Sequence, residues 1–236
     1  MVPESASAFQ GLLTGALDES RLNAVQRVEA AKEPALREVR YDELAYTYLA
    51  WNNRLPQFED ARVRRALTML IDREGIAASL YGGLARPANG PLPPGLWAHD
   101  ATLAPLPHDP AKAAALLDEA GWRKGKDGVR AKSGVRLAFS LSFGAGSDRQ
   151  RQIPELAQRS FREAGIDMAL VPMEWGAFVD VVDSGDYEAC SLALNLDPHP
   201  DLRPNWHSSQ VPPNGMKPPC RAMPFMIADM PNSRTP

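Results

Sequence analysis

The stretch that decides the fold spans residues 46–76 and reads YTYLAWNNRLPQFEDARVRRALTMLIDREGI. Its first part, residues 46–52, places aromatic, β-branched and aliphatic side chains on both faces, which predicts a strand buried on both sides. Its second part, residues 58–76, predicts a helix capped by Asp60, because apolar residues recur at helical spacing after this aspartate. Those apolar residues are Val63, Ala66, Leu67 and Leu70.

The same stretch contains a long motif between Asn52 and Arg73. It reads Asn-x(5)-Phe-x-Asp-x-Arg-Val-Arg-Arg-Ala-Leu-x(4)-Asp-Arg and resembles the signature of solute-binding protein family 5. Members of that family are the oligopeptide- and dipeptide-binding receptors of bacterial ABC importers. The resemblance extends over roughly residues 5–215. It implies an α/β, periplasmic-binding-protein-like (type II) fold of two lobes, of which this chain holds mostly the second.

Composition excludes several other classes of protein. Charged residues make up 23% of the 236 residues and apolar ones 44%, as in a globular protein. The net charge is −3 and no Lys/Arg-rich block is present, so we expect no nucleic-acid partner. No apolar run approaches the roughly 18 residues of a membrane-spanning helix, and we expect no signal peptide in this chain. Two cysteines, Cys190 and Cys220, do not make a disulfide framework.

Three parts of the chain follow from the resemblance and from a change in composition. Residues 1–49 correspond to the end of the first lobe and the hinge strand, and residues 50–210 to the second lobe. Residues 211–236 form a tail with seven of the chain's 22 prolines, a density that opposes helices and strand ladders alike. We expect this tail to be irregular and aberrant from about residue 217. The strand at 46–52 would then lack the returning partner that the family places after the second lobe.

The helix predicted at residues 109–121 has a complete set of boundary signals. Asp109 is its N-cap, Pro110 occupies the first helical position, and Gly121 supplies a left-handed stop. This helix carries no candidate chemistry, so we interpret it as scaffold.

Strands and helices then alternate to the end of the second lobe. Strands are predicted at 135–143, 166–173 and 187–194, with helices at 149–164 and 175–182. Such alternation predicts crossover units, a mainly parallel sheet and helices on its faces. Open sheets of this class bind ligands beyond the carboxyl ends of their strands. The two loops at 174–175 and 195–201 are therefore the candidate binding segments.

Asp197 is the candidate ligand for a charged group. The resemblance places it where an aspartate of the peptide-binding members meets the α-ammonium group of the peptide. A cationic terminus buried in a closed cleft needs a carboxylate, because an unpaired buried charge costs several kcal/mol. The alternative is that Asp197 only begins a turn before Pro198.

Trp175, Leu194 and Asn195 complete the candidate site near Asp197. The pair formed by Glu174 and Trp175 stands where the family has a Glu-Trp pair, so Trp175 is either a pocket wall or a core anchor. Leu194 stands where the family has a tryptophan, which implies a less aromatic cleft. Asn195 begins the loop that follows the last strand.

Asn89 lies in a Gly/Pro-rich loop at residues 81–95. The composition of this loop forbids regular structure and is typical of a linker. The resemblance implies that the loop borders the ligand cleft, which makes Asn89 a candidate ligand contact.

Metal binding and catalysis are weaker alternatives. The run 197–201 (DPHPD) offers a histidine and two carboxylates, but its prolines hold the side chains apart along an extended backbone, and only His207 could add a ligand. Gly144 and Gly146 follow a strand, yet the third glycine of a dinucleotide-binding loop is missing. We therefore predict no metal, no cofactor and no enzyme activity.

The sequence as a whole predicts the extracytoplasmic or periplasmic substrate-binding component of an ABC transporter for peptides or peptide-like solutes. Its expected partners are that small-molecule ligand and the ABC permease in the membrane, and it is expected to be a monomer. A nucleotide-dependent α/β enzyme and a non-binding fragment remain the alternatives.

Overall fold

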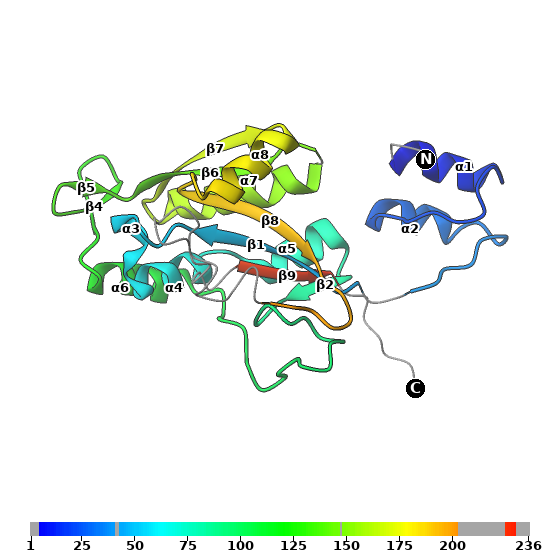
Figure 1. Cartoon of the computed structure of the whole chain (residues 1–236), viewed down its shortest axis with the longest axis horizontal. Coiled ribbons are helices and arrows are strands. Elements are labelled where there is room, and N and C mark those ends of the chain that lie inside the picture. The colour runs from blue at the N-terminus through cyan, green and yellow to red at the C-terminus, as the bar shows by residue number, and fades with distance from the viewer. Residues whose placement is uncertain (1–4, 41–42, 147, 203–224, 230–236) are drawn as a thin grey trace.

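Strands from widely separated parts of the chain form one sheet in the computed structural model, which describes residues 5–40, 43–146, 148–202 and 225–229 (Figure 1). The helices are α1 (Ser5–Leu13), α2 (Ala24–Ala30), α3 (Pro56–Glu59), α4 (Ala61–Met69), α5 (Arg73–Tyr81), α6 (Pro110–Glu119), α7 (Asp148–Glu163) and α8 (Trp175–Ser184). The strands are β1 (Ala45–Trp51), β2 (Ala85–Pro87), β3 (Arg123–Lys124), β4 (Arg130–Lys132), β5 (Val135–Arg136), β6 (Ala138–Gly144), β7 (Asp167–Met173), β8 (Ala189–Asn195) and β9 (Phe225–Asp229).

The six-stranded sheet has the order β2-β9-β1-β8-β6-β7, and β3, β4 and β5 form a small separate sheet. Strand β6 runs parallel to both β7 and β8, whereas β1 is antiparallel to β8 and β9, and β9 is antiparallel to β2. The prediction of a mainly parallel sheet is therefore wrong, and the sheet is mixed. Strands β6, β7 and β8 are joined by α7 and α8, and such helical crossovers make consecutive strands parallel, whereas β1 and β9 run antiparallel to both of their neighbours.

Strand β1 is buried on both faces, as predicted. Leu49 and Trp51, at 0% and 1% exposure, belong to the main core, which the sheet forms with α4, α5, α6 and α7. Tyr46, Tyr48 and Ala50 point the other way into a second cluster, which is closed by Phe178 of α8 and by Ala88, Tyr187 and Cys190. Alternate side chains of one strand thus serve two separate cores.

Strand β9 corrects the expectation for the tail. It lies between β1 and β2, with Tyr46 opposite Ala228 and Pro87 opposite Ile227. The prediction that the strand at 46–52 lacks a partner on this side is therefore wrong. The prediction weighed proline density over all of 211–236, whereas the segment between Pro224 and Pro231 contains no proline and can form a ladder. The remaining residues of the tail lie outside the described residues.

The helix predicted at residues 58–76 is divided into α3, α4 and α5. Asp60, with φ −77° and ψ 123°, ends α3 and caps α4 by accepting a hydrogen bond from the backbone N–H of Arg62 at 2.8 Å. The predicted cap is confirmed. A second break follows α4, where Asp72 caps α5 by accepting from the N–H of Gly75 at 2.9 Å.

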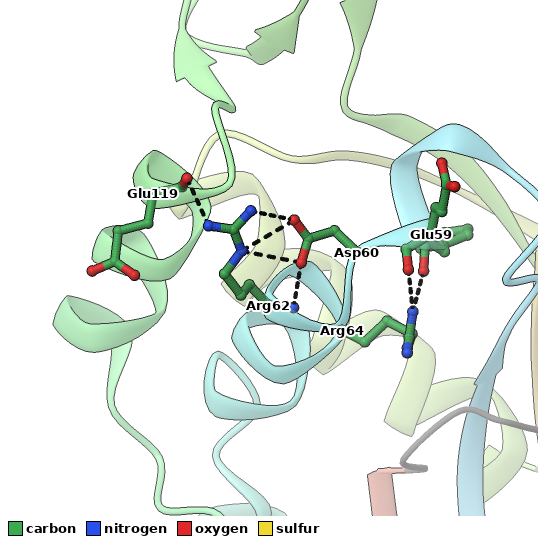
Figure 2. Close-up of polar contacts among 6 residues, drawn as sticks. Glu59, Asp60, Arg62, Arg64 and Glu119 are labelled. Atoms are coloured by element: carbon green, nitrogen blue, oxygen red, sulfur yellow. Dashed lines mark hydrogen bonds and ion pairs between the residues drawn. The ribbon is translucent and has the colours of Figure 1, made fainter.

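Charged side chains of the motif hold this junction together (Figure 2). The Arg62 guanidinium contacts the Asp60 carboxylate at 2.6 Å and also donates to the carbonyl of Glu119, at the end of α6, at 2.9 Å. Arg64 donates to the carbonyls of Phe58 and Glu59 at 2.6 and 2.8 Å, which satisfies the carboxyl end of α3. The motif is therefore a structural brace between α3, α4 and α6.

Replacing Asp60 with alanine should destabilise the protein by about 1 kcal/mol at pH 7, because the cap of α4 is lost. The hydrogen bond from Arg62 lowers the pKa of Asp60 below its ordinary value of 3.8, against the opposing effect of partial burial. A depressed pKa in the folded state stabilises above the ordinary pKa, and this contribution is lost as the pH falls through the folded value. In urea unfolding, the difference in the free energy of unfolding between the wild type and Asp60→Ala should therefore become smaller from pH 7 to pH 3.

Asp180→Ala is the matched control, since Asp180 is exposed on α8. It should change the free energy of unfolding by less than about 0.5 kcal/mol. If Asp60→Ala lowers the free energy of unfolding by the same amount at both pH values, the ionised cap does not have this role.

Candidate functional site

The carboxyl ends of β6, β7 and β8 meet at one edge of the sheet, which we call the carboxyl edge. Because β6 is parallel to both neighbours, Gly144, Met173 and Asn195 all end their strands at this edge. The beginning of β1 lies here as well, with Ala45 opposite Asn195. In the view of Figure 1 this edge is on the side of α1 and α2.

Two backbone hydrogen bonds extend the strand ladders past the carboxyl edge. The N–H of Ala145 donates to the carbonyl of Met173 at 2.9 Å, and the N–H of Leu196 donates to the carbonyl of Leu44 at 2.7 Å. The loops that follow these strands therefore leave from fixed positions.

Trp175 begins α8 directly after β7 and is 53% exposed. Its ring lies 5.9 Å from that of Phe178 and also covers the backbone of Gly144, where an added Cβ would lie 2.9 Å from indole Cε3. Glu174 fixes the start of the helix by accepting from the N–H groups of Gly176 and Ala177 at 2.7 and 3.2 Å. Trp175 is thus not a buried core anchor. One side of the indole packs against Gly144 and Phe178, and about half of its surface is exposed to solvent.

Asp197 is exposed in the loop that follows β8. Among the residues that the structure describes, no hydrogen bond or ion pair engages its carboxylate, so a side-chain turn bond before Pro198 is not formed there. A carboxylate in this condition is available to a ligand cation.

Leu194 and Asn195 point to opposite faces at the end of β8. Leu194 is partly buried against the second cluster, on the same face as Tyr46, its partner across the ladder. Asn195 is exposed at the carboxyl edge. The structure therefore brings Asn195 and Asp197 to the edge, while Leu194 contributes mainly to packing.

Asn89 holds its own loop together. Its amide donates to the carbonyls of Asp100 and Leu103 at 3.1 and 2.5 Å. The preceding residue, Ala88, is 3% exposed and belongs to the same cluster as Leu194 and Leu196. The loop thus begins at the cluster against which Leu194 and Leu196 also pack, although Asn89 itself is occupied with backbone contacts.

Within the described residues, no group of three or more histidine, cysteine, aspartate or glutamate side chains could hold a metal ion. Asp197, His199 and Asp201 of the considered metal site are exposed, and His207 lies outside the described residues. Over the same ranges of the chain, every helix is too short or too polar to cross a membrane. Cys190 is buried at 0% exposure, and Cys220 lies outside the described residues.

Three residues that bear on the site were missed from the sequence. Gly144 was considered only as part of a phosphate-binding loop, yet the indole of Trp175 packs directly against it; we call this contact surface the seat of Trp175. Trp97 is 78% exposed in the loop of Asn89, and Arg73, which ends the long motif, is only 5% exposed. An isolated tryptophan in a Gly/Pro-rich loop was the only available signal for Trp97, whereas contacts distant in sequence decide the roles of the other two.

Comparison with known proteins defines the class. The chain matches the family described as bacterial extracellular solute-binding proteins, family 5 Middle, over residues 1–213, and it belongs to that family. It is 29% identical over 216 residues to the oligopeptide-binding protein AppA of Bacillus subtilis, covering 89% of this chain and 40% of AppA. It is 31% identical over 157 residues to the di/tripeptide-binding protein 2 of Pseudomonas aeruginosa, covering 66% of this chain and 28% of that protein.

Solved structures agree on the fold. The structure of Bacillus subtilis AppA in complex with a nonapeptide matches with a TM-score of 0.78 and 27% identity, over 99% of this chain and 45% of that one. A dipeptide binding protein from Pseudoalteromonas sp. SM9913 in complex with Met-Leu matches with a TM-score of 0.70 and 26% identity, over 92% of this chain and 42% of that one. The fold is thus part of a type II periplasmic binding protein, and the chain spans less than half the length of these relatives.

The seat of Trp175 can be tested with Gly144→Ala. The new Cβ would approach indole Cε3 to 2.9 Å, so the ring must move away from the end of β6. We expect a loss of about 1 kcal/mol, at the low end for overpacking, because the half-exposed ring can rotate outward. The loss should disappear in a Trp175→Ala background, as a double-mutant cycle of urea unfolding would measure.

Gly146→Ala is the control, since an added Cβ there meets only the side chain of Gln150 at 3.5 Å, an ordinary contact. If Gly144→Ala lowers the free energy of unfolding by the same amount in the Trp175→Ala background, the packing of the indole on Gly144 is refuted.

Proposed function

We propose that this chain supplies the second lobe of the extracytoplasmic substrate-binding component of an ABC transporter for peptides or peptide-like solutes. The observation that carries the proposal is the family match over residues 1–213, combined with the open carboxylate of Asp197 at the carboxyl edge. In this proposal residues 1–49 end the first lobe, residues 50–210 form the second, and residues 211–236 are the tail.

The ligand class rests on the site rather than on the family alone. The relatives include proteins named for oligopeptides and for di- and tripeptides, and also a heme-binding protein A of Haemophilus influenzae at 25% identity. An open carboxylate and a half-exposed indole at the same edge of the sheet suit a ligand that has an ammonium group and an apolar side chain, as a peptide amino terminus has. Asp197 would bind the α-ammonium group, and Trp175 would pack against the adjoining side chain.

Asn195 and Asn89 have smaller proposed contributions. The exposed amide of Asn195 can accept from or donate to a peptide backbone at the carboxyl edge. Asn89 would act through the loop that it holds in place, and Leu194 by packing below the site.

A nucleotide-dependent enzyme is less well supported than a binding protein. The Gly144 position that suggested a phosphate loop has another physical explanation, because it accommodates the indole of Trp175. Hinge closure of two lobes on the solute requires no covalent chemistry. The partners of the whole receptor would be the solute and the membrane permease. We propose a monomer located in the periplasm or outside the cytoplasm.

Replacing Asp197 with asparagine in the whole receptor should weaken the binding of free peptides by about 3–5 kcal/mol, because the buried ammonium group loses its partner. Peptides with an acetylated amino terminus carry no such charge, so their already weaker binding should not fall further. Isothermal titration of both peptide forms against both proteins measures the difference.

Asp183→Asn, an exposed substitution on α8, controls for the general loss of one negative charge. An equal loss of affinity for free and acetylated peptides would reject Asp197 as the ammonium ligand. An absence of peptide binding by the unaltered receptor would reject the proposed function itself.

A further inference from the structure

Residues 88–106 make up most of the segment that joins β2 to α6, and they contain no helix or strand. Side-chain hydrogen bonds nevertheless connect distant positions within this segment. We call residues 88–106 the braced loop. In Figure 1 it is the long green segment that extends from the sheet beside β2 and β9. A connection of this length without regular structure is usually either mobile or functional.

Arg73 connects the two ends of the braced loop. It is the first residue of α5 and only 5% exposed, and its guanidinium donates to the carbonyl of Ala88 at 3.3 Å and to that of Leu106. In the described part of the chain no carboxylate forms an ion pair with Arg73. A buried guanidinium without an ion pair depends on carbonyl oxygens to offset its desolvation, so both loop ends are strongly specified.

The charges and backbone contacts around Arg73 are consistent with its role in joining the two ends of the braced loop. Burial lowers the pKa of Arg73, and the negative charge of Glu74 opposes the shift. The backbone N–H of Asp109 donates to the carbonyl of Met69 at 2.9 Å, which fixes the chain where the loop enters α6. The junction between α4 and α5 thus holds the end of the braced loop as well as its beginning.

Two further side chains, Asn89 and His99, make contacts within the part of the chain whose ends Arg73 joins. Asn89 reaches the carbonyls of Asp100 and Leu103, and His99 Nδ1 lies 2.7 Å from the carbonyl of Leu92. Together they form nested cross-links that replace the backbone ladder of an ordinary hairpin. Leu96, at 6% exposure, adds an apolar anchor near the middle of the loop.

The braced loop carries two large exposed apolar side chains, Trp97 and, at 54% exposure, Leu103. Trp97 follows the anchored Leu96 and is 78% exposed. Ala88, at the base of the loop, belongs to the second cluster, and Leu194 and Leu196, which precede Asp197, pack against that same cluster. An exposed tryptophan on a fixed backbone offers contact area at low entropic cost.

We infer that Arg73 is a positioning residue for solute binding, which fixes the braced loop as a preformed wall and so presents Trp97 to an apolar side chain of the peptide ligand. The binding half of this inference rests on the proposed function, whereas the bracing half can be tested without a ligand.

Limited proteolysis with chymotrypsin tests the bracing, because Trp97 is a cleavage site on an exposed loop. Arg73→Met, which keeps side-chain volume but removes the donors, should speed cleavage after Trp97 by roughly 10-fold through local opening. Arg73→Lys should give an intermediate rate, since one ammonium reaches both carbonyls less well than a planar fork. Arg65→Met, at an exposed arginine of α4, should leave the rate unchanged.

Asn89→Ala provides a second route to the same result if Arg73→Met fails to fold, because it breaks an inner cross-link at a partly exposed position. Cleavage at the wild-type rate in a folded Arg73→Met protein, or in Asn89→Ala where Arg73→Met does not fold, would overturn the bracing.

The binding half is tested in the whole receptor by titration with a pool of mixed-sequence nonapeptides. Arg73→Met should weaken binding roughly 3- to 10-fold, the cost of ordering one or two side chains on association. In a Trp97→Ala background the same substitution should have no further effect. An undiminished effect in that background would overturn the role of Trp97. Wild-type receptor that binds no peptide would overturn the proposed function, while the proteolysis result would stand by itself.

Discussion

The double enclosure of β1 is the constraint on which the rest of the structure depends. The strand is hydrogen-bonded on both edges, to β8 and β9, and buried on both faces. A strand in this position has no freedom of register, since a shift by one residue would exchange the side chains of its two cores. Trp51 then determines where the chain goes next, because its ring stacks on Phe58 at 5.5 Å, and Phe58 meets Phe139 at 4.9 Å. The helices after β1 are thereby folded back onto the sheet.

The residues that identify the family are not the residues that could bind a solute. Asp60, Arg62 and Arg64 are charged, yet their contacts are with one another and with helix ends. Arg73 likewise uses its charge on backbone carbonyls. These four charged side chains of the motif are therefore occupied, and the open carboxylate of Asp197 lies at the other end of the second lobe's sequence. A motif can identify a protein without containing its binding chemistry.

Local signals predicted the elements well, and long-range pairing accounts for the errors. The cap at Asp109, the proline at the first helical position and the glycine at φ +88° at Gly121 are all determined within one helix, and α6 follows them. The direction of β1 and the pairing of β9 depend on residues far away in the sequence, so alternation of strands and helices could not reveal them. The same limit applies to the candidate site. A strand-end rule predicted the position of Trp175, but its seat on Gly144 joins residues 31 positions apart.

The geometry of the carboxyl edge couples the proposed ligand contacts to the proposed hinge. Leu44 precedes β1 and Leu196 follows β8, and these two residues are hydrogen-bonded to each other at 2.7 Å. Strands β1 and β8 are held together beyond this pair by a continuous ladder from Ala45 to Trp51, so a movement at Leu44 and Leu196 would disturb the sheet little. Asp197 is one residue beyond this pair. If the proposed hinge lies here, a ligand ammonium group bound by Asp197 would lie next to it, and binding and closure would act on the same few residues. Trp175 and the braced loop, by contrast, are anchored to the second lobe through Gly144 and Arg73 and would remain fixed while the lobes move.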